Sequence, residues 1–415
     1  MQTVPTQDDS RPAIAYLAGE FPLRSETFVY REVRGLRARG HRVVCVSLNV
    51  PSDPPADCDD LLRGRVLVYG FAALSTLRAS LRETVRHPLR ALLIMLGAWR
   101  DVVFPGEPMS TRSRMKLPGQ AVFAIGLAGK LRERRVRHIH AHFAHAPTTL
   151  AMYAASQLGV PFSFTGHAND LFQRRALLKR KLRRAAFVSC ISEWHRALYR
   201  SIVPRDDRSY PVIRCGVDLA EFAPVDRTLD PGPPIHVLTV CRLVEKKGVD
   251  TLLRALQAFD PTAQRWRLTV AGDGPQRPKL ETLASQLGIA SAVRFLGAVG
   301  NEQVRQLLGE CHTFALPCRV DSAGDKDGIP VVLMEAMACG VPVIAGNLDA
   351  IRELVEDGKS GLLVDGTRVE PTRDALRALF DTPSLRVSLG RAGRQRVEDE
   401  FSLQATLDRI ERSLG

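Results

Sequence analysis

Two acidic residues in the second half of the chain have the spacing of a ligand-binding pair. Asp327 and Glu335 lie eight positions apart in the segment DGIPVVLMEAMACGVPVIA, where a glycine-containing loop runs into an apolar helical stretch. Gly328 allows the backbone to approach a ligand closely, and Pro330 suits the first turn of a helix. The free N–H groups of that turn can bind a diphosphate, and the two carboxylates can bind hydroxyl groups of a sugar and a ribose. The segment therefore predicts a site for a ligand that carries both phosphate and sugar.

Two cations follow the apolar run IHVLTV. Arg242 and Lys247 are five positions apart in CRLVEKKGVD, directly after a predicted strand. Fixed positive charges there would stabilise a diphosphate on which negative charge grows as it leaves; the alternative is that both are simple surface charges. Lys246, beside Lys247, is expected to be a solvated charge. Further along, Gly272 in GDGP follows another predicted strand, where a glycine allows close packing beside a nucleotide.

Histidines are the side chains of the first half that are suited to substrate or metal contacts. His138, His140 and His142 alternate along HIHAHF, so all three are expected on one face of a strand. That face could bind a metal ion, or His142 could line a substrate pocket. His167, in TGHAND, is either a ligand for a sugar hydroxyl or a buried structural histidine, and Asp170 either orients it or caps the next helix.

These residues follow strands in a chain that alternates strands and helices. The first half opens with a strand at 13–18, a helix that begins near Ser25-Glu26-Thr27 and a second strand at 42–50. After a proline-rich stretch, six further strands are expected at 235–240, 267–271, 293–296, 313–316, 341–345 and 361–364. This order is typical of doubly wound parallel sheets, so the fold class is α/β. We expect a first domain at 1–221, a linker at 222–234, a second domain at 235–397 and an amphipathic C-terminal helix.

Charge and composition restrict the class of protein. The 415 residues carry a net charge of +13, and residues 1–215 hold 34 Lys and Arg against 17 Asp and Glu, so the excess belongs to the first half. A basic half indicates an anionic partner, such as a phospholipid surface or a lipid diphosphate. The eight cysteines have no zinc spacing, and we find neither a secretory signal nor an apolar run long enough to span a bilayer. We therefore expect a cytoplasmic protein.

Two segments of the first half suit contact with a membrane. Residues 72–103 interleave Leu, Ile and Trp with Arg, which fits either a helix packed on the sheet or one lying on a membrane surface. The basic run between Arg174 and Arg184 fits either a solvated helix face or a docking site for anionic lipid. Aromatic residues are sparse there, so nucleic acid is not an expected partner.

The segment from Asp327 to Ala345 resembles the E-x7-E motif of family 4 glycosyltransferases, with Asp327 in place of the commoner Glu and Glu335 at the second position. The earlier segments CRLVEKKGVD and GDGP also match that family in order and spacing. The resemblance implies the GT-B fold, in which two Rossmann-like doubly wound parallel-sheet domains face a cleft, and transfer with retention of configuration. It also implies that the C-terminal helix, 398–415, packs back on the first domain. The D-x-D pattern from Asp325 to Asp327, a metal motif of a different glycosyltransferase fold, is the less favoured alternative.

The resemblance assigns roles to individual residues. Catalytic roles fall to Arg242 and Lys247 at the leaving diphosphate and to Asp327 and His167 at the donor sugar. The implied donor-binding residues are Glu335, Gly328, Ile329, Pro330, Gly272 and Gly19. The implied acceptor-side residues are Ser25, Glu26, His142 and Asp170. No metal site and no cofactor are expected.

Together these roles predict a glycosyltransferase that uses a UDP- or GDP-linked sugar and a glycan or lipid-linked acceptor, in the cytoplasm or peripherally at the inner face of the plasma membrane. FPLRSETFVYREVRGLRARGH and SAGDKDGIPVVLMEAMACG look like the subgroup that builds bacterial exopolysaccharide or colanic-acid-type repeat units. The alternatives are a nucleotide-sugar hydrolase or epimerase on the same fold, and a non-catalytic polysaccharide- or membrane-binding protein.

Overall fold

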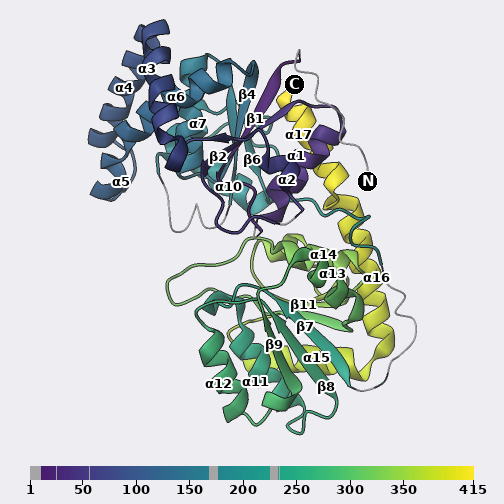
Figure 1. Ribbon diagram of the computed structural model, residues 1–415. Coiled ribbons are helices and arrows are strands. Elements are labelled where there is room, and N and C mark those ends of the chain that lie inside the picture. The colour runs from purple at the N-terminus through teal and green to yellow at the C-terminus, as the bar shows by residue number, and fades with distance from the viewer. Residues whose placement is uncertain (1–10, 25, 56, 168–175, 225–231, 233) are drawn as a thin grey trace. The chain divides into compact units, whose positions relative to one another are not determined.

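The computed structural model describes residues 11–24, 26–55, 57–167, 176–224, 232 and 234–415 (Figure 1). The chain forms two compact units. The first contains residues up to Arg214 together with Thr406–Gly415, and the second runs from Cys215 to Ala405. Among the described residues, no helix is both long enough and apolar enough to cross a membrane.

The first unit is built on a six-stranded parallel sheet with the order β3-β2-β1-β4-β5-β6. The strands are β1 (Ala13–Glu20), β2 (Val43–Asn49), β3 (Val66–Leu67), β4 (Val136–His142), β5 (Phe162–Gly166) and β6 (Val188–Cys190). Most of their residues are buried, as the apolar runs predict for a sheet covered on both faces. The strand order reverses between β1 and β4, and such a switch point is where α/β sheets bind ligands at the carboxyl ends of their strands.

Helices surround this first sheet. They are α1 (Thr27–Ala38), α2 (Asp59–Leu62), α3 (Ala73–Arg86), α4 (Pro88–Val103), α5 (Thr111–Met115), α6 (Leu117–Arg132), α7 (Ala146–Leu158), α9 (Leu178–Arg184) and α10 (Glu193–Ile202). The helix α17 (Leu403–Leu414) supplies residues 406–414 to this unit, where Arg39 forms ion pairs with Asp408 at 2.6 Å and Glu411 at 2.7 Å. The amphipathic stretch at 72–103 forms two helices, α3 and α4, which lie beside α6 (Figure 1).

The second unit repeats the plan with a parallel sheet of order β12-β11-β10-β7-β8-β9. Its strands are β7 (Ile235–Val240), β8 (Trp266–Ala271), β9 (Val293–Gly297), β10 (Thr313–Leu316), β11 (Val343–Gly346) and β12 (Leu362–Val364). Its helices are α11 (Val249–Phe259), α12 (Arg277–Gln286), α13 (Asn301–Glu310), α14 (Val331–Ala338), α15 (Val369–Asp381) and α16 (Pro383–Glu400). Separate apolar cores against α14 and against α11 and α15 show that both faces of the sheet are covered. The predicted α/β class and the six strands of the second half are confirmed.

The division between the units falls before the proline-rich stretch at 222–234. Val217 and Phe222 are buried in the core of the second unit. Val217 also exchanges backbone hydrogen bonds with Phe401 at 2.9 Å and Leu403 at 2.8 Å. These contacts explain why the second unit begins at Cys215.

Candidate functional site

An ion pair between Lys247 and Asp327 lies at the carboxyl edge of the second sheet. Lys247 follows β7 and Asp327 follows β10, the two strands at which this sheet's order reverses. The Lys247 Nζ atom lies 2.8 Å from Asp327 Oδ2, with the two side chains 14% and 13% exposed. Burial alone would raise the pKa of Asp327, but Lys247 and Lys246 outweigh it and lower that pKa below its ordinary value. Asp327 is therefore a carboxylate at neutral pH.

Lys246 is part of this charge cluster, so the expectation that it is solvated was wrong. Its Nζ lies 2.9 Å from Asp325 Oδ2 and 3.4 Å from Asp327 Oδ1. Lys246 and Lys247 stand on a short 3-10 turn, η2 (Glu245–Lys247), and both lysines reach the loop after β10. A thiol completes the cluster, because Cys318 Sγ donates to Asp327 Oδ2 at 3.2 Å.

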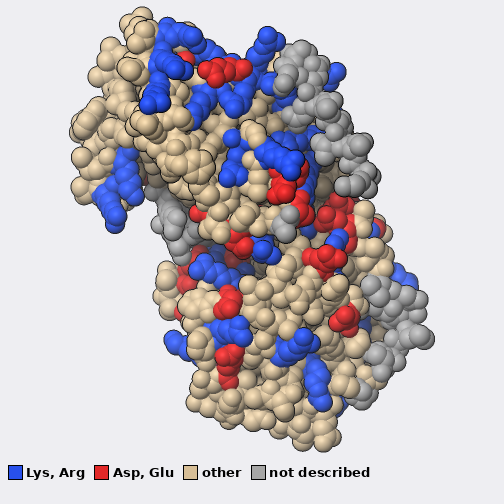
Figure 2. Space-filling view, viewed as in Figure 1, with Lys and Arg blue, Asp and Glu red and all other residues tan. Residues whose placement is uncertain are grey.

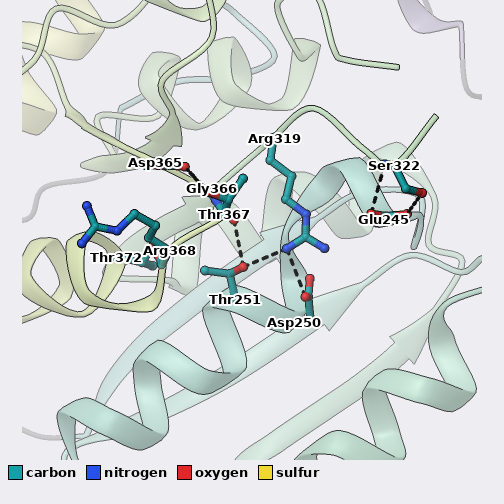
Figure 3. Close-up of polar contacts among 10 residues, drawn as sticks. All are labelled: Glu245, Asp250, Thr251, Arg319, Ser322, Asp365, Gly366, Thr367, Arg368 and Thr372. Atoms are coloured by element: carbon teal, nitrogen blue, oxygen red, sulfur yellow. Dashed lines mark hydrogen bonds and ion pairs between the residues drawn. The ribbon is translucent and has the colours of Figure 1, made fainter. Parts of the chain in front are cut away.

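The long loop after β10 is tied to the start of α11 (Figure 3). Arg319 Nη1 donates to Asp250 Oδ2 at 3.1 Å and to Thr251 Oγ1 at 3.0 Å. Ser322 Oγ donates to Glu245 Oε2 at 2.8 Å. These bonds hold the loop against η2 and so set the position of Asp327 relative to Lys247. Sequence reasoning missed this set of residues, because Arg319 and Asp250 lie 69 positions apart in the chain and Ser322 and Glu245 lie 77 apart.

Glu335 is placed on α14, the helix that follows this loop. Its side chain is buried, and the helix begins directly after Pro330, whose φ of −66° and ψ of 125° make it the N-cap. Gly328, Ile329 and Pro330 are half-buried and connect Asp327 to the helix. Asp327 thus precedes the start of α14, where free N–H groups favour an anion, and Glu335 lies about one turn further along the helix.

Arg242 is exposed just after β7, and the described residues give it no ion-pair partner. Gly272 packs directly against this segment. Its φ of 130° favours glycine, and a Cβ there would overlap the carbonyl oxygen of Cys241. Asp273 has structural contacts, accepting from Gly274 N at 2.7 Å and Arg277 Nη1 at 3.2 Å. The GDGP loop therefore supports the backbone that presents Arg242.

In the first unit, His167 lies at the carboxyl end of β5 and is buried between two phenylalanine rings. The ring centroids of Phe28 and Phe143 are 4.6 and 4.8 Å from that of His167. Its Nε2 lies 3.5 Å from His142 Nδ1. Burial lowers the pKa of His167 well below its ordinary value, and His142 lowers it further. His167 is thus a neutral imidazole, able to donate one hydrogen bond and accept another.

The alternating histidines of β4 do share one face, as predicted. His138 Nε2 and His140 Nδ1 both lie 2.7 Å from Ser163 Oγ, and the rings of His140 and His142 are 5.1 Å apart. Glu32 Oε1 lies 3.5 Å from His142 Nε2 and accepts a 2.6 Å hydrogen bond from the Tyr16 hydroxyl.

Glu32, His140 and His142 offer atoms within 4.8 Å of one another, a spacing that a metal ion could use. However, both ring nitrogens of His140 already have hydroxyl partners, Ser163 at 2.7 Å and Thr165 at 3.1 Å. We therefore interpret Glu32, His140 and His142 as a buried hydrogen-bonded cluster.

Two other predicted residues of the first unit, Gly19 and Glu26, lie at the end of β1 and at the start of α1. Gly19 is at the end of β1 with open space where a side chain would be, and the neighbouring Glu20 accepts hydrogen bonds from Ser52 at 2.7 and 2.8 Å. Glu26 is the N-cap residue of α1. Ser25 and Asp170 lie outside the described residues.

The basic run at 174–184 is neither a uniform solvated face nor a uniform lipid-docking face. Lys181 is 0% exposed, and its Nζ donates to the carbonyls of Ala144 at 2.6 Å, His145 at 2.9 Å and Ala176 at 2.6 Å. Arg180 pairs with a buried carboxylate on α4, that of Asp101. Two cations of the run therefore hold the fold together, whereas Lys179, Arg183 and Arg184 are exposed. Arg174 and Arg175 lie outside the described residues.

Comparison with known proteins matches two family models to the two halves of the chain. The model described as Glycosyltransferase Family 4 matches residues 25–221, and the model described as Glycosyl transferases group 1 matches residues 226–396. The protein WcaL of Salmonella typhimurium, which is named as a glycosyltransferase of colanic acid biosynthesis, is 28% identical over 94% of this chain and 97% of its own. A GDP-mannose-dependent phosphatidylinositol monomannoside mannosyltransferase of Mycobacterium tuberculosis is 30% identical over 78% of this chain and 81% of its own.

Solved structures show the same fold over nearly the whole chain. The Anabaena protein HepE in complex with UDP has a TM-score of 0.71 at 16% identity, covering 97% of this chain and 99% of that one. Sucrose-phosphate synthase of Thermosynechococcus elongatus has a TM-score of 0.70 at 20% identity, covering 97% and 98%.

Proposed function

Because this chain belongs to glycosyltransferase family 4 and has the GT-B fold, we propose that it moves a sugar from a nucleoside-diphosphate sugar to a glycan or lipid-linked acceptor, with retention of anomeric configuration. The observation that carries the proposal is the cluster at the switch point of the second sheet. There Lys247 and Asp327 pair at 2.8 Å, Arg242 stands exposed and Glu335 lies on the next helix. Cations and carboxylates in this arrangement suit a ligand that is anionic at one end and rich in hydroxyls at the other.

Each group has a distinct role in the proposed reaction. Glu335 accepts hydrogen bonds from the ribose, and Arg242, Lys247 and the N–H groups at the start of α14 bind the diphosphate. As the glycosidic bond breaks, negative charge grows on the diphosphate, and fixed cations stabilise that state more than the ground state. The proton of the acceptor hydroxyl passes to the departing phosphate oxygen, so no protein nucleophile is assigned.

Asp327 and His167 are assigned to the donor sugar. Asp327 stays ionised beside Lys247 and so accepts hydrogen bonds from sugar hydroxyls. His167 is neutral, so it contributes a directional hydrogen bond rather than a charge. An aspartate reaches one methylene less far than a glutamate, and we expect this to select the hydroxyl pattern of the donor sugar. Gly19, Glu26 and His142 remain assigned as predicted, at the donor phosphate and the acceptor.

The donor base is proposed to be uracil or guanine. HepE is seen with UDP, and two similar mannosyltransferases are named for their dependence on GDP-mannose. The similarity to WcaL supports a place in exopolysaccharide synthesis. We also propose that the basic first unit works at an anionic membrane surface, on the inner face of the plasma membrane. Metal is assigned no part in the proposed reaction.

A thermal-shift panel tests the donor assignment. UDP, GDP, ADP and their common sugars are compared on the wild type, Glu335→Ala and Glu310→Ala. Glu310 is an exposed glutamate at the carboxyl end of α13, away from the candidate site, and serves as the matched control. A ligand at 100 times its Kd stabilises the native state by about 2.7 kcal/mol. We expect one nucleotide to raise Tm in the wild type and Glu310→Ala but not in Glu335→Ala.

The outcomes separate the proposal from its rivals. No shift with any nucleotide in a folded protein would contradict donor binding and favour a non-catalytic binding protein. Donor turnover that releases free sugar equally with and without acceptor would favour a hydrolase. Metal independence is tested by repeating the assay with a chelator, which is expected to leave turnover unchanged.

A further inference from the structure

The helices α3 and α4 expose their large apolar side chains, whereas a helix that packs on a globular core normally buries them. On α3 the exposed apolar residues follow helical spacing: Leu74, Leu77, Leu81 and Val85. The buried residues of the same helix are polar: Thr76, Ser80 and Glu83. With about 3.6 residues per turn, the two sets occupy opposite sides of the helix. The hydrophobic face of α3 therefore points into solvent.

The helix α4 shows the same inversion more strongly. Its exposed apolar residues again form one stripe: Leu89, Leu92, Leu93, Leu96, Trp99 and Val103. Its buried side is made mainly of small or acidic residues: Ala91, Ile94, Ala98 and Asp101. Among the described residues, all exposed large apolar side chains except Val50 and Val320 lie between residues 71 and 115. In the described part of the chain, exposed large apolar side chains are thus concentrated on α3, α4 and the segment that follows them.

Polar contacts on the inner sides of both helices fix the orientation of each helix against the rest of the unit. Glu83 of α3 accepts a 2.7 Å hydrogen bond from Arg132 of α6. Asp101 of α4 accepts a 3.0 Å hydrogen bond from Tyr153 of α7 and pairs with Arg180. Rotating either helix to bury its leucines would expose or orphan these carboxylates. The leucine faces are therefore available to an external partner.

The exposed charges around the leucines are all of one sign. Within residues 71–116 every charged side chain that is exposed is basic: Arg78, Arg82, Arg86, Arg90, Arg100, Arg112 and Lys116. The acidic residues Glu83 and Asp101 are buried, and Glu107 is half-buried. In Figure 2 the surface over α3, α4 and α5 is largely tan with blue side chains. An apolar face with only cations around it complements an anionic surface that also has an apolar interior.

We infer that the hairpin of α3 and α4, defined by residues 71–104, docks the protein on an anionic phospholipid bilayer. Its leucines and Trp99 enter the interfacial layer, and Arg78, Arg82 and Arg86 meet the lipid phosphates. A second copy of this chain is a poorer occupant, because two such faces would place arginines opposite arginines, and like charges across an interface disfavour association. The inference rests on the proposed function, which assigns a glycan or lipid-linked acceptor and a site of action at the membrane. The binding of vesicles can nevertheless be measured without donor or acceptor. Its failure would leave the transferase proposal intact.

Trp99 provides the direct readout. It is 52% exposed, whereas Trp266 is fully buried and Trp194 half-buried, so Trp99 is the tryptophan in position to sense lipid. The full-length protein is mixed with vesicles of phosphatidylcholine alone or with 30% phosphatidylglycerol, a composition chosen on the order of natural anionic content. We expect a blue shift of emission and quenching by brominated acyl chains only with the anionic vesicles. Trp99→Phe keeps the apolar face and is expected to lose the spectral signal while still co-sedimenting.

Two multiple variants separate the apolar and electrostatic parts. Leu92→Ser, Leu93→Ser and Leu96→Ser together are expected to lower vesicle affinity by at least tenfold. Arg78→Gln, Arg82→Gln and Arg86→Gln together are expected to reduce the dependence on phosphatidylglycerol and on salt. Val50→Ser, which removes an exposed valine outside the hairpin, is the matched control and is expected to bind like the wild type.

The result that overturns the inference is equal sedimentation of the wild type and the leucine variant, with both folded by circular dichroism. A blue shift of Trp99 that depends on protein concentration and needs no vesicles would also overturn it, and would identify self-association as the use of this face. Because each substituted leucine is exposed, the variants are expected to fold.

Discussion

Replacing Lys247 by Met tests how the candidate site holds its charges. At the observed 2.8 Å, Coulomb's law with an effective dielectric constant of about 20 gives a gross attraction of about 6 kcal/mol. Loss of hydration offsets much of this, and breaking a buried pair costs about 3–5 kcal/mol when the remaining charge has no other partner. Here Lys246 stays 3.4 Å from Asp327, so that carboxylate keeps one cation. We therefore expect Lys247→Met to lower the free energy of unfolding by about 1–3 kcal/mol.

The expected effect on catalysis is larger than the effect on stability. If Lys247 stabilises the leaving diphosphate, its loss should lower kcat by about 10²–10³-fold, as for the removal of one transition-state hydrogen-bond donor. Lys359→Met is the matched control, because Lys359 is 78% exposed on the same unit. It should change the free energy of unfolding by less than about 0.5 kcal/mol. The measurements are urea unfolding followed by circular dichroism, and donor turnover under saturating nucleotide-sugar.

A double-mutant cycle with Asp327→Asn decides whether the pair acts as a unit. Contacting charged groups show coupling free energies of about 0.5–3 kcal/mol, so the double variant should be less destabilised than the sum of the singles. Strictly additive losses would refute the coupling that the 2.8 Å contact implies. Near-normal kcat in Lys247→Met would refute its role at the leaving group, even if the stability prediction holds.

Three further outcomes are expected. Lys181→Met should cost about 2–5 kcal/mol, because three buried carbonyls lose their donor, whereas Lys179→Met, on the exposed side, should be near neutral in the same urea titration. Gly272→Ala should weaken nucleotide binding in calorimetry while Tm also falls, since φ is 130° and Cys241 blocks a Cβ; an unchanged Kd would show that this loop does not support the donor site. Stability should fall as the pH is lowered from about 6.5 toward 4, because burial lowers the pKa of His138 and of His195 to about 4. As the pH falls, the unfolded chain binds these protons before the folded chain does, so the free energy of unfolding should fall by about 1.4 kcal/mol per histidine per pH unit. His138→Gln should therefore make the plot of the free energy of unfolding against pH less steep in urea titrations.

Local pattern was enough to predict the fold class. Strands such as IHVLTV are short apolar runs that end at loops with charged or glycine residues, and helices such as α11 have apolar residues at helical spacing, so both signals lie in neighbouring residues. The roles of Arg242, Lys247, Asp327 and Glu335 came from the resemblance of their segments to family 4 glycosyltransferases, not from local pattern. The structure places Arg242 and Lys247 after β7 and Asp327 after β10, the strands at which the order of the second sheet reverses.

Partners across the fold could not be read from the sequence. Lys246 looked like a solvated charge because its neighbours in the chain do not pair with it, and only the loop after β10 brings Asp325 to 2.9 Å. Lys181 looked like one cation among several in a basic run. Its burial depends on carbonyls from α7 and from the segment before α9, which approach it only once the unit has folded.

The same limit explains the hairpin of α3 and α4. The sequence by itself determined that residues 72–103 form amphipathic helices, since the leucines recur at helical spacing. Periodicity shows that a stripe exists, but it does not say which side of the helix meets the core. The tertiary structure decided this, because Glu83 and Asp101 found buried partners on α6, α7 and α9 that hold the polar sides inward. A carboxylate can be buried only where a partner from a distant part of the sequence meets it. Because Glu83 and Asp101 have such partners, the polar sides of the helices face the unit and the apolar stripes face solvent.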